Sequence, residues 1–228
     1  MKIWPIPFLL GVLAIIAGNL SFILAVKEGF IDICFPYLEG CSSISKTGRQ
    51  GLSFIIFKLI ILPVMTLLSI YWLLSYYLIK KTIEVNKLAL QTMLTSGLVG
   101  SVFGIIYASF LGSEGDIYQL LRRFGIYFFF LGTYLSQVLE VYLLLKSQKN
   151  LNSIYPKIMK SLTSLIGLVL VFSLPIYGFI EEDDWLENIL EWNITLLIFI
   201  YFILASLFWK EKDYLFVLRS NYLDKGKP

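Results

Sequence analysis

The residues best placed for chemistry are the few polar side chains that fall inside long apolar stretches. Glu140 lies within the stretch 124–145, with Gln137 about one helical turn before it, and Gln91 lies at a similar depth in the stretch 88–111. An ionisable group inside a membrane is costly to bury and often marks a functional site. We expect Glu140 to face the helix that carries Gln91, with Gln137 and Gln91 as its polar neighbours. It is then either paired structurally or used for proton coupling or headgroup binding.

Lys58 is the one basic residue well inside an apolar stretch, six residues after Leu52. A lysine this close to the end of a helix can extend its apolar stem and keep its ammonium group at the interface. We therefore expect Lys58 to reach the membrane surface, and a role in a buried site is the alternative.

Cys34 and Cys41 are the two cysteines of the chain and lie in one short polar segment. A disulfide between them would close a small loop, and it could form in an oxidising compartment. The C-x₂-C spacing of redox-active dithiols is absent, so a structural disulfide is favoured over a catalytic dithiol. Two free thiols remain a third interpretation.

A run of small and basic residues follows the second cysteine. Backbone N–H groups near a glycine can bind an anion, and arginine can bind a phosphate through two N–H groups. An ordinary polar loop is the alternative, because the spacing matches no recognised phosphate-binding loop. The candidates for contact with a lipid headgroup or a partner are Ser43, Ser45, Lys46, Gly48 and Arg49.

The composition excludes several classes of protein. Of the 228 residues, 57% are hydrophobic and 15% are charged, whereas soluble domains have roughly a quarter charged residues. With no histidine and two cysteines, the chain cannot form histidine-ligated zinc or haem sites or a Cys₄ iron–sulfur cluster. We expect no cofactor and no metal site. The small net charge of +3 gives no reason to expect a nucleic-acid partner.

The apolar stretches fall at about residues 4–26, 52–78, 88–111, 124–145, 158–180 and 189–209. Each is close to the roughly 20 residues that a helix needs to cross a bilayer. The sequence therefore predicts an all-α, polytopic integral membrane protein. Six transmembrane helices form one bundle, as a single domain over residues 1–228.

The basic residues indicate the orientation of these helices. Of the 19 lysines and arginines, 13 fall on the side that carries both termini, and cytoplasmic loops hold such an excess. We therefore expect cytoplasmic N and C termini. The opposite side carries the acidic loop 181–184, which Glu187 and Glu191 continue without a basic residue.

Small residues recur at every fourth position of the stretch 88–111. Such rows allow helices in a membrane to pack closely. The stretch 4–26 has a shorter row and is the expected partner. The central residues of the first row are Gly100, Gly104 and Ala108, and the second row consists of Ala17, Ser21 and Ala25.

Three segments together resemble a known family. They are Ser43-Ile-Ser-Lys-Thr-Gly48, Tyr107-Ala-Ser-Phe-Leu-Gly112 and Arg123-Phe-Gly125, with Gly132-Thr133 opening an aromatic helix. The pattern, which covers about residues 40 to 145, is similar to the damage-regulated autophagy modulator (DRAM) family and its relatives in GPI-anchor lipid remodelling. Six helices with cytoplasmic termini also fit that family.

The resemblance implies a non-enzymatic membrane protein that binds or organises lipids, or that binds a membrane partner or a second copy of itself. Its location would be the plasma membrane, a bacterial inner membrane or an endomembrane. The alternative is a membrane subunit of a small transporter or exporter. A lipid-modifying enzyme is disfavoured, because Ser43 and Lys46 form the one Ser-x-x-Lys pattern and lie in a polar loop where the lysine stays charged.

The orientation can be tested with added cysteines in intact cells. We expect Ser147→Cys to resist an impermeant thiol reagent and Asp183→Cys to react with it, because the two positions fall on opposite sides of the predicted membrane. The reverse labelling pattern would show that the termini lie outside.

Overall fold

The computed structural model describes residues 2–82, 86–146, 153–177 and 185–215. Six long helices account for most of them, and all six are long and apolar enough to cross a membrane. The predicted all-α fold with six spans is confirmed. The acidic loop 181–184 lies outside the described residues, and the side of the membrane on which the termini lie stays a prediction. The long helices are α1 (Pro5–Lys27), α4 (Gly51–Thr82), α5 (Lys87–Phe110), α6 (Asp116–Lys146), α8 (Tyr155–Tyr177) and α9 (Trp185–Glu211).

Two single-turn helices, α2 (Pro36–Glu39) and α3 (Ile44–Thr47), lie in the connection between α1 and α4. We call the end of the bundle that carries them the loop end, and the opposite end the terminal end. At the terminal end the two ends of the described chain meet, since Lys2 pairs with Asp213 at 3.1 Å and the Ile3 N–H donates to the Tyr214 carbonyl. Because the number of spans is even, both ends of the described chain lie at the same end of the bundle.

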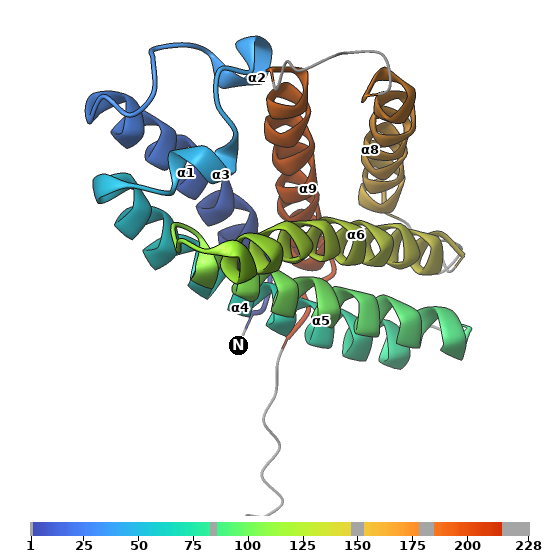
Figure 1. Cartoon of the computed structure of the whole chain (residues 1–228). Coiled ribbons are helices and arrows are strands. Elements are labelled where there is room, and N and C mark those ends of the chain that lie inside the picture. The colour runs from blue at the N-terminus through green and yellow to red at the C-terminus, as the bar shows by residue number, and fades with distance from the viewer. Residues whose placement is uncertain (1, 83–85, 147–152, 178–184, 216–228) are drawn as a thin grey trace, which may run out of the picture.

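The helices form a closed ring in chain order. Each long helix packs against the next, and α9 returns to pack against α1. Figure 1 shows α4, α5 and α6 running across α8 and α9 at a wide angle. Short connections favour this order, because consecutive helices are usually neighbours in space.

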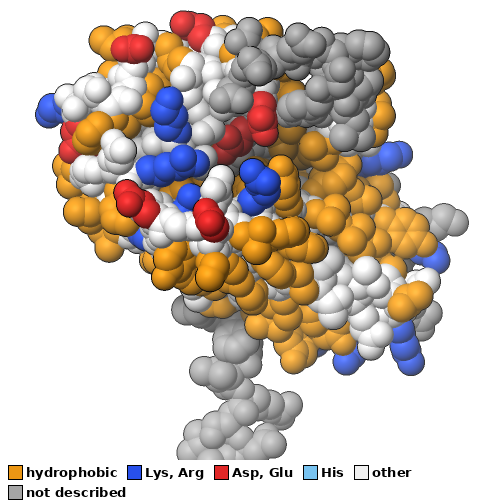
Figure 2. Space-filling view, viewed as in Figure 1, with side chains coloured by type: hydrophobic (Ala, Val, Ile, Leu, Met, Phe, Trp, Pro, Cys, Tyr) orange, Lys and Arg blue, Asp and Glu red, His pale blue; other side chains and the backbone are white. Residues whose placement is uncertain are grey.

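The surface has the distribution of side chains that a membrane protein needs. Figure 2 shows a broad hydrophobic belt, with mixed acidic and basic side chains near the loop end and basic ones near the opposite edge. Many large apolar side chains of the helices are exposed, among them Leu59 at 68% and Leu131 at 62%. In a bilayer such side chains face lipid rather than water.

One helix starts earlier than the sequence predicts. The apolar stretch begins near residue 124, but α6 begins at Asp116. The first turns carry charged residues, which hydropathy assigns to a loop. In the structure the Arg122 guanidinium donates to the backbone carbonyls of Phe110 and Ser113, so it holds the end of α5 against an extended α6.

The small-residue row of α5 serves close packing, as expected. A Cβ added at Gly100 would lie 3.0 Å from the Thr133 nitrogen of α6, and one at Gly104 would lie 2.5 Å from Met65 Sδ of α4. Ala108 is fully buried. The row therefore lies between α4 and α6.

The expected pairing of this row with α1 is wrong. Short connections keep α5 between its two neighbours in the chain. Helix α6 also contributes a small residue of its own to the contact, since a Cβ added at Gly132 would lie 2.5 Å from the Ser96 carbonyl oxygen of α5. Because the glycines on both helices have no side chain, the two backbones can approach each other closely.

The row on α1 packs against α4 instead. Ala17, Ser21 and Ala25 are buried, and the Ser21 hydroxyl lies 3.5 Å from the Ser53 carbonyl of α4. Both small-residue rows thus serve close packing, each with a neighbour in the ring.

We predict that Gly104→Leu destabilises the protein far more than Leu131→Ala. A leucine at Gly104 must displace Met65 and Phe129, and overpacking of this kind costs about 1–3 kcal/mol or more. Leu131 is exposed on α6, so its truncation removes little protein packing. Thermal melting of both variants in one detergent measures the difference, and equal melting temperatures would contradict the packing described.

Candidate functional site

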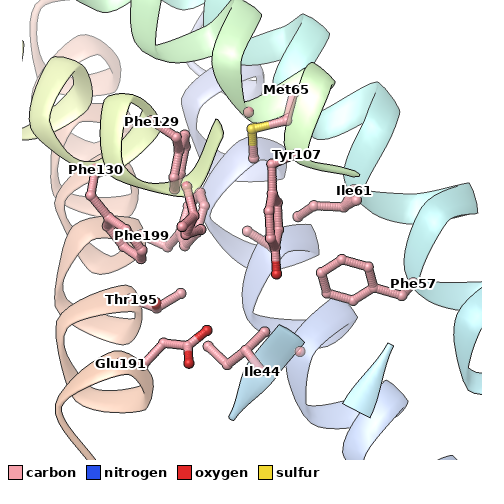
Figure 3. A pocket seen from close by; sticks show the side chains of 14 residues that line it. Ile44, Phe57, Ile61, Met65, Tyr107, Phe129, Phe130, Glu191, Thr195 and Phe199 are labelled. Carbon is pink, nitrogen blue, oxygen red and sulfur yellow. The ribbon is translucent and has the colours of Figure 1, made fainter. Parts of the chain in front are cut away.

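A cavity lies at the loop end of the ring, enclosed by α1, α3, α4, α5, α6 and α9 (Figure 3). Counted together with the part that is open to the exterior, its empty space is about 500 Å³. We call it the loop-end cavity. Its lining residues are Ala14, Gly18, Ile44, Phe57, Ile61, Met65, Gly104, Tyr107, Ile126, Phe129, Phe130, Glu191, Thr195 and Phe199.

The deep part of the cavity is apolar. Met65 and Phe129 are 3% and 4% exposed and pack tightly against Gly104, since a Cβ added there would lie 2.5 Å from Met65 Sδ and 3.0 Å from the Phe129 ring. Phe129 of α6 stacks with Phe199 of α9 at a ring-centroid distance of 6.4 Å. In Figure 3 these rings lie at the end of the cavity away from Glu191.

The other part of the cavity is polar. Glu191 and Thr195 lie one turn apart on α9, and Figure 3 shows the Glu191 carboxylate and the Tyr107 hydroxyl at the same end of the cavity. The Thr195 hydroxyl oxygen is shielded from solvent and has no hydrogen-bond partner among the described residues. The backbone N–H groups of Ile44 and Ser45, at the start of α3, face the Glu191 carboxylate.

The loop residues expected to contact a headgroup border this polar part. Ser43 caps α3 by accepting the Lys46 N–H at 3.1 Å. Ser45 Oγ accepts a hydrogen bond from the Arg49 guanidinium at 3.1 Å and interacts with the Tyr107 hydroxyl. Lys46 is exposed. The structure thus brings Ser45 and Arg49 to the mouth of the cavity.

Gly48 has a packing role. It is buried, and a Cβ there would lie 3.0 Å from the Phe57 ring and 3.1 Å from Leu111. A larger residue would push α3 away from the wall of the cavity.

The polar residues of the cavity itself are not among the candidates that the sequence suggests. Because Glu191 follows Glu187, the sequence favours an acidic loop there. In the structure α9 begins at Trp185, so Glu191 lies in its second turn and faces inward. The signal is present in the sequence, since Glu191 falls inside the apolar stretch 189–209 and Thr195 follows at the i+4 position on the same helix face.

Glu140 forms a second polar cluster, toward the terminal end. It is 2% exposed and accepts hydrogen bonds from Tyr71 Oη at 2.6 Å, Tyr201 Oη at 2.7 Å and Ser75 Oγ. These donors come from α4 and α9, so the carboxylate joins three helices. We call these four residues the Glu140 cluster.

Of the two expected neighbours of Glu140, Gln91 is wrong, because it is exposed. Gln137 does lie beside the Glu140 cluster, since the Tyr201 hydroxyl lies 3.3 Å from its backbone carbonyl, but its side chain donates to the Ile198 carbonyl of α9 at 3.0 Å. The prediction places Glu140 against α5, but its side of α6 faces into the ring, where α4 and α9 meet. The direction of a helix face relative to its neighbours cannot be read from depth alone.

Lys58 is partly exposed, and its reach to a membrane interface stays a prediction. Its ammonium group donates to the Ser109 carbonyl of α5 at 2.9 Å and lies 4.3 Å from the centre of the Phe54 ring. It therefore joins α4 to the end of α5 and contacts neither the cavity nor the Glu140 cluster.

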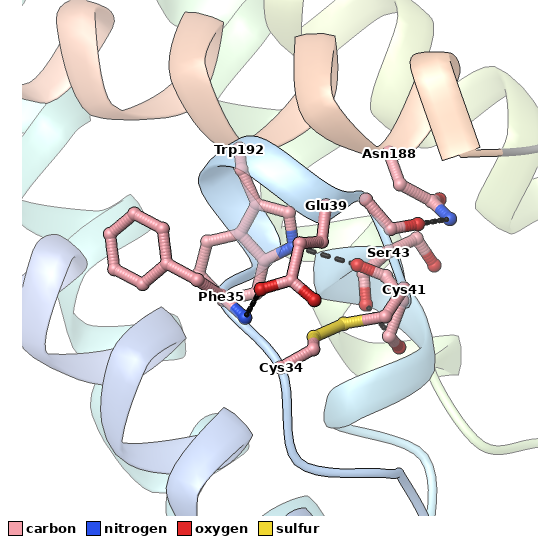
Figure 4. Close-up of a disulfide and its surroundings, with 9 residues drawn as sticks. Cys34, Phe35, Glu39, Cys41, Ser43, Asn188 and Trp192 are labelled. Atoms are coloured by element: carbon pink, nitrogen blue, oxygen red, sulfur yellow. Dashed lines mark hydrogen bonds between the residues drawn. A yellow bond between two sulfur atoms is a disulfide. The ribbon is translucent and has the colours of Figure 1, made fainter.

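The structure pairs Cys34 with Cys41 across α2, with Cα atoms 6.6 Å apart (Figure 4). This segment is held against α9. Asn188 donates to the Gly40 carbonyl at 2.7 Å, and Trp192 Nε1 donates to the Ser42 carbonyl at 2.8 Å. The disulfide loop thus fixes the path that leads into α3 and the mouth of the cavity.

Tyr37 connects the same loop to α1. Its hydroxyl lies 2.9 Å from the Asn19 amide nitrogen and 3.2 Å from the Asn19 amide oxygen. Burial raises the pKa of the Tyr37 phenol above its usual value, although the hydrogen bond to Asn19 opposes this shift. The phenol therefore stays neutral and can both donate and accept.

A family model described as the Frag1/DRAM/Sfk1/Cwh43P N-terminal domain matches residues 2–209, which include both polar clusters and nearly all of the six long helices. No curated protein and no solved structure matches the chain.

We predict that Glu140→Leu strongly destabilises the protein and that Glu140→Gln does so much less. Leucine leaves three buried hydroxyls without their acceptor, and each unsatisfied group costs about 1–3 kcal/mol. Glutamine keeps the shape and one acceptor oxygen. Melting in detergent compares the variants, and a wild-type melting temperature for Glu140→Leu would show that the cluster does not stabilise the ring.

Proposed function

The chain belongs to the Frag1/DRAM/Sfk1/Cwh43P family, and on that premise we propose that it binds a membrane lipid in the loop-end cavity without catalysing a reaction on it. An acyl chain would lie along the apolar wall that includes Met65 and Phe129, and the headgroup would remain at the polar part near Glu191. The six apolar helices make the protein an integral membrane protein.

The cavity is the observation that supports this proposal. It is apolar at depth and polar at one end, and its polar end lies near the loop end of the helices, where a membrane has its headgroups. Unfilled apolar space is unfavourable, because the residues around it lack contact partners on one side. A lipid chain would supply those contacts.

The proposal of a binding protein rather than an enzyme is supported by the groups at the mouth. Ser45, the hydroxyl nearest to Arg49, is engaged by that guanidinium and by Ser43. The chain has no histidine that could activate a hydroxyl as a nucleophile. These groups offer hydrogen bonds and charges, which are what binding requires.

A photoreactive lipid tests the proposal. We expect a phospholipid with a diazirine near the end of an acyl chain to label Met65 or Phe129, because both are buried from surrounding lipid and only a chain inside the cavity can reach them. Mass spectrometry of the purified, irradiated protein locates the label.

A matched pair of variants provides the control. Thr195→Phe places a ring inside the cavity and should abolish the internal label, whereas Thr66→Phe places the same ring on the exposed side of α4 and should not. Labelling confined to lipid-facing residues, unchanged between the two variants, would show that no lipid enters.

A further inference from the structure

The loop-end cavity contains an acidic group that an apolar ligand would not need. Glu191 faces the cavity from the second turn of α9. Glu191 forms no ion pair among the described residues, although the charge of Arg49 acts on it and the backbone N–H groups of Ile44 and Ser45 face it from one side. A carboxylate has about four acceptor positions, so those toward the cavity stay open to a ligand that donates hydrogen bonds.

Two further acceptors lie at the same end of the cavity. The Thr195 hydroxyl is shielded and has no partner among the described residues, and the Tyr107 hydroxyl points to the same side as Glu191 (Figure 3). Three oxygen-bearing side chains therefore converge on one space. A primary ammonium group has three N–H donors and no acceptor, which matches such a set.

Basic side chains lie farther out. Arg49 is exposed at the mouth, and its guanidinium is held by Ser45 Oγ at 3.1 Å. The charges of Arg49, Arg122 and Glu191 all act on the Tyr107 hydroxyl, so both signs of charge meet at the polar end. Guanidinium groups bind phosphate well.

The acyl chain cannot supply selectivity. Lipid tails outside the protein are as apolar as the cavity wall, so a chain gains little from the transfer itself. Discrimination among lipids must therefore come from the headgroup and its contacts at the polar end.

We infer that the loop-end cavity selects a phospholipid whose headgroup carries a primary ammonium group beside its phosphate, with the ammonium bound by Glu191, Thr195 and Tyr107 and the phosphate facing Arg49. This inference rests on the proposed function and adds the class of lipid. The depth of Glu191 suits contact with a headgroup. Glu191 lies six residues after Trp185 at the start of α9, or roughly 9 Å along the helix.

Three phospholipids with identical oleoyl chains test it on the full-length protein. Their headgroups are ethanolamine, choline and glycerol, which carry respectively an ammonium with N–H donors, a quaternary ammonium without them, and no cation. We expect the ethanolamine lipid to bind about tenfold or more tightly than the glycerol lipid, as measured by native mass spectrometry at a series of lipid concentrations. The choline lipid should fall between the two.

The variant Glu191→Gln should lose this preference and bind all three lipids alike. Glu187→Gln is the matched control, because it removes the same charge from an exposed position one turn earlier on the same helix, and it should keep the preference. If Glu191→Gln does not fold, Thr195→Val replaces it. Removing that unpartnered hydroxyl should weaken ethanolamine-lipid binding severalfold and leave glycerol-lipid binding unchanged.

The outcomes separate the two proposals. Equal binding of the three lipids to the wild-type protein, or an ethanolamine preference that survives Glu191→Gln, would overturn the inference. If Thr195→Phe abolishes lipid binding in that case, the proposed lipid site is still supported. If none of the lipids binds, or if Thr195→Phe binds them as the wild type does, the proposed function fails together with the inference.

Discussion

The structure depends on the need to satisfy a buried carboxylate of one helix with hydroxyl groups from two others. Glu140 takes hydroxyl hydrogen bonds from Tyr71, Ser75 and Tyr201, so α4, α6 and α9 are joined across the inside of the ring. In a membrane the hydrophobic effect does not hold helices together, and close packing and hydrogen bonds must do so. A carboxylate without these donors would cost several kcal/mol.

The position of that cluster explains where the cavity lies. Between α6 and α9, Gln137 donates to the Ile198 carbonyl next to the Glu140 cluster, and the Phe129 and Phe199 rings stack farther along. Beyond those rings the same two helices border the cavity rather than each other. Polar contacts close the ring toward the terminal end, and the cavity lies at the loop end.

The elements that define the fold could be predicted because they depend on local sequence. An apolar stretch of sufficient length specifies a span, and paired cysteines seven residues apart specify a small loop. Small residues such as Gly104 mediate close packing, as their spacing predicts. Their partner could not be predicted, because the identity of a neighbour depends on how the whole ring closes.

The candidate site was less predictable for the same reason. Ser45 and Arg49 could be identified as candidates from their residue types alone. In the sequence, however, Glu191 resembles part of the acidic loop, and Tyr107 stands out only as part of a segment that resembles a known family. Both belong to the cavity because α5 and α9 present them to a common space, which no single stretch of sequence records. Likewise, the hydroxyls around Glu140 come from segments more than 60 residues away in the chain.

We propose that a phospholipid occupies the loop-end cavity with its headgroup at Glu191. An experimental structure of the wild-type protein in nanodiscs that contain ethanolamine and glycerol phospholipids tests it most directly. We expect continuous density for an acyl chain along the cavity wall at Met65 and Phe129, ending in a headgroup beside Glu191 and Thr195. A cavity closed by its own side chains, or filled only by water at Glu191, would contradict the claim.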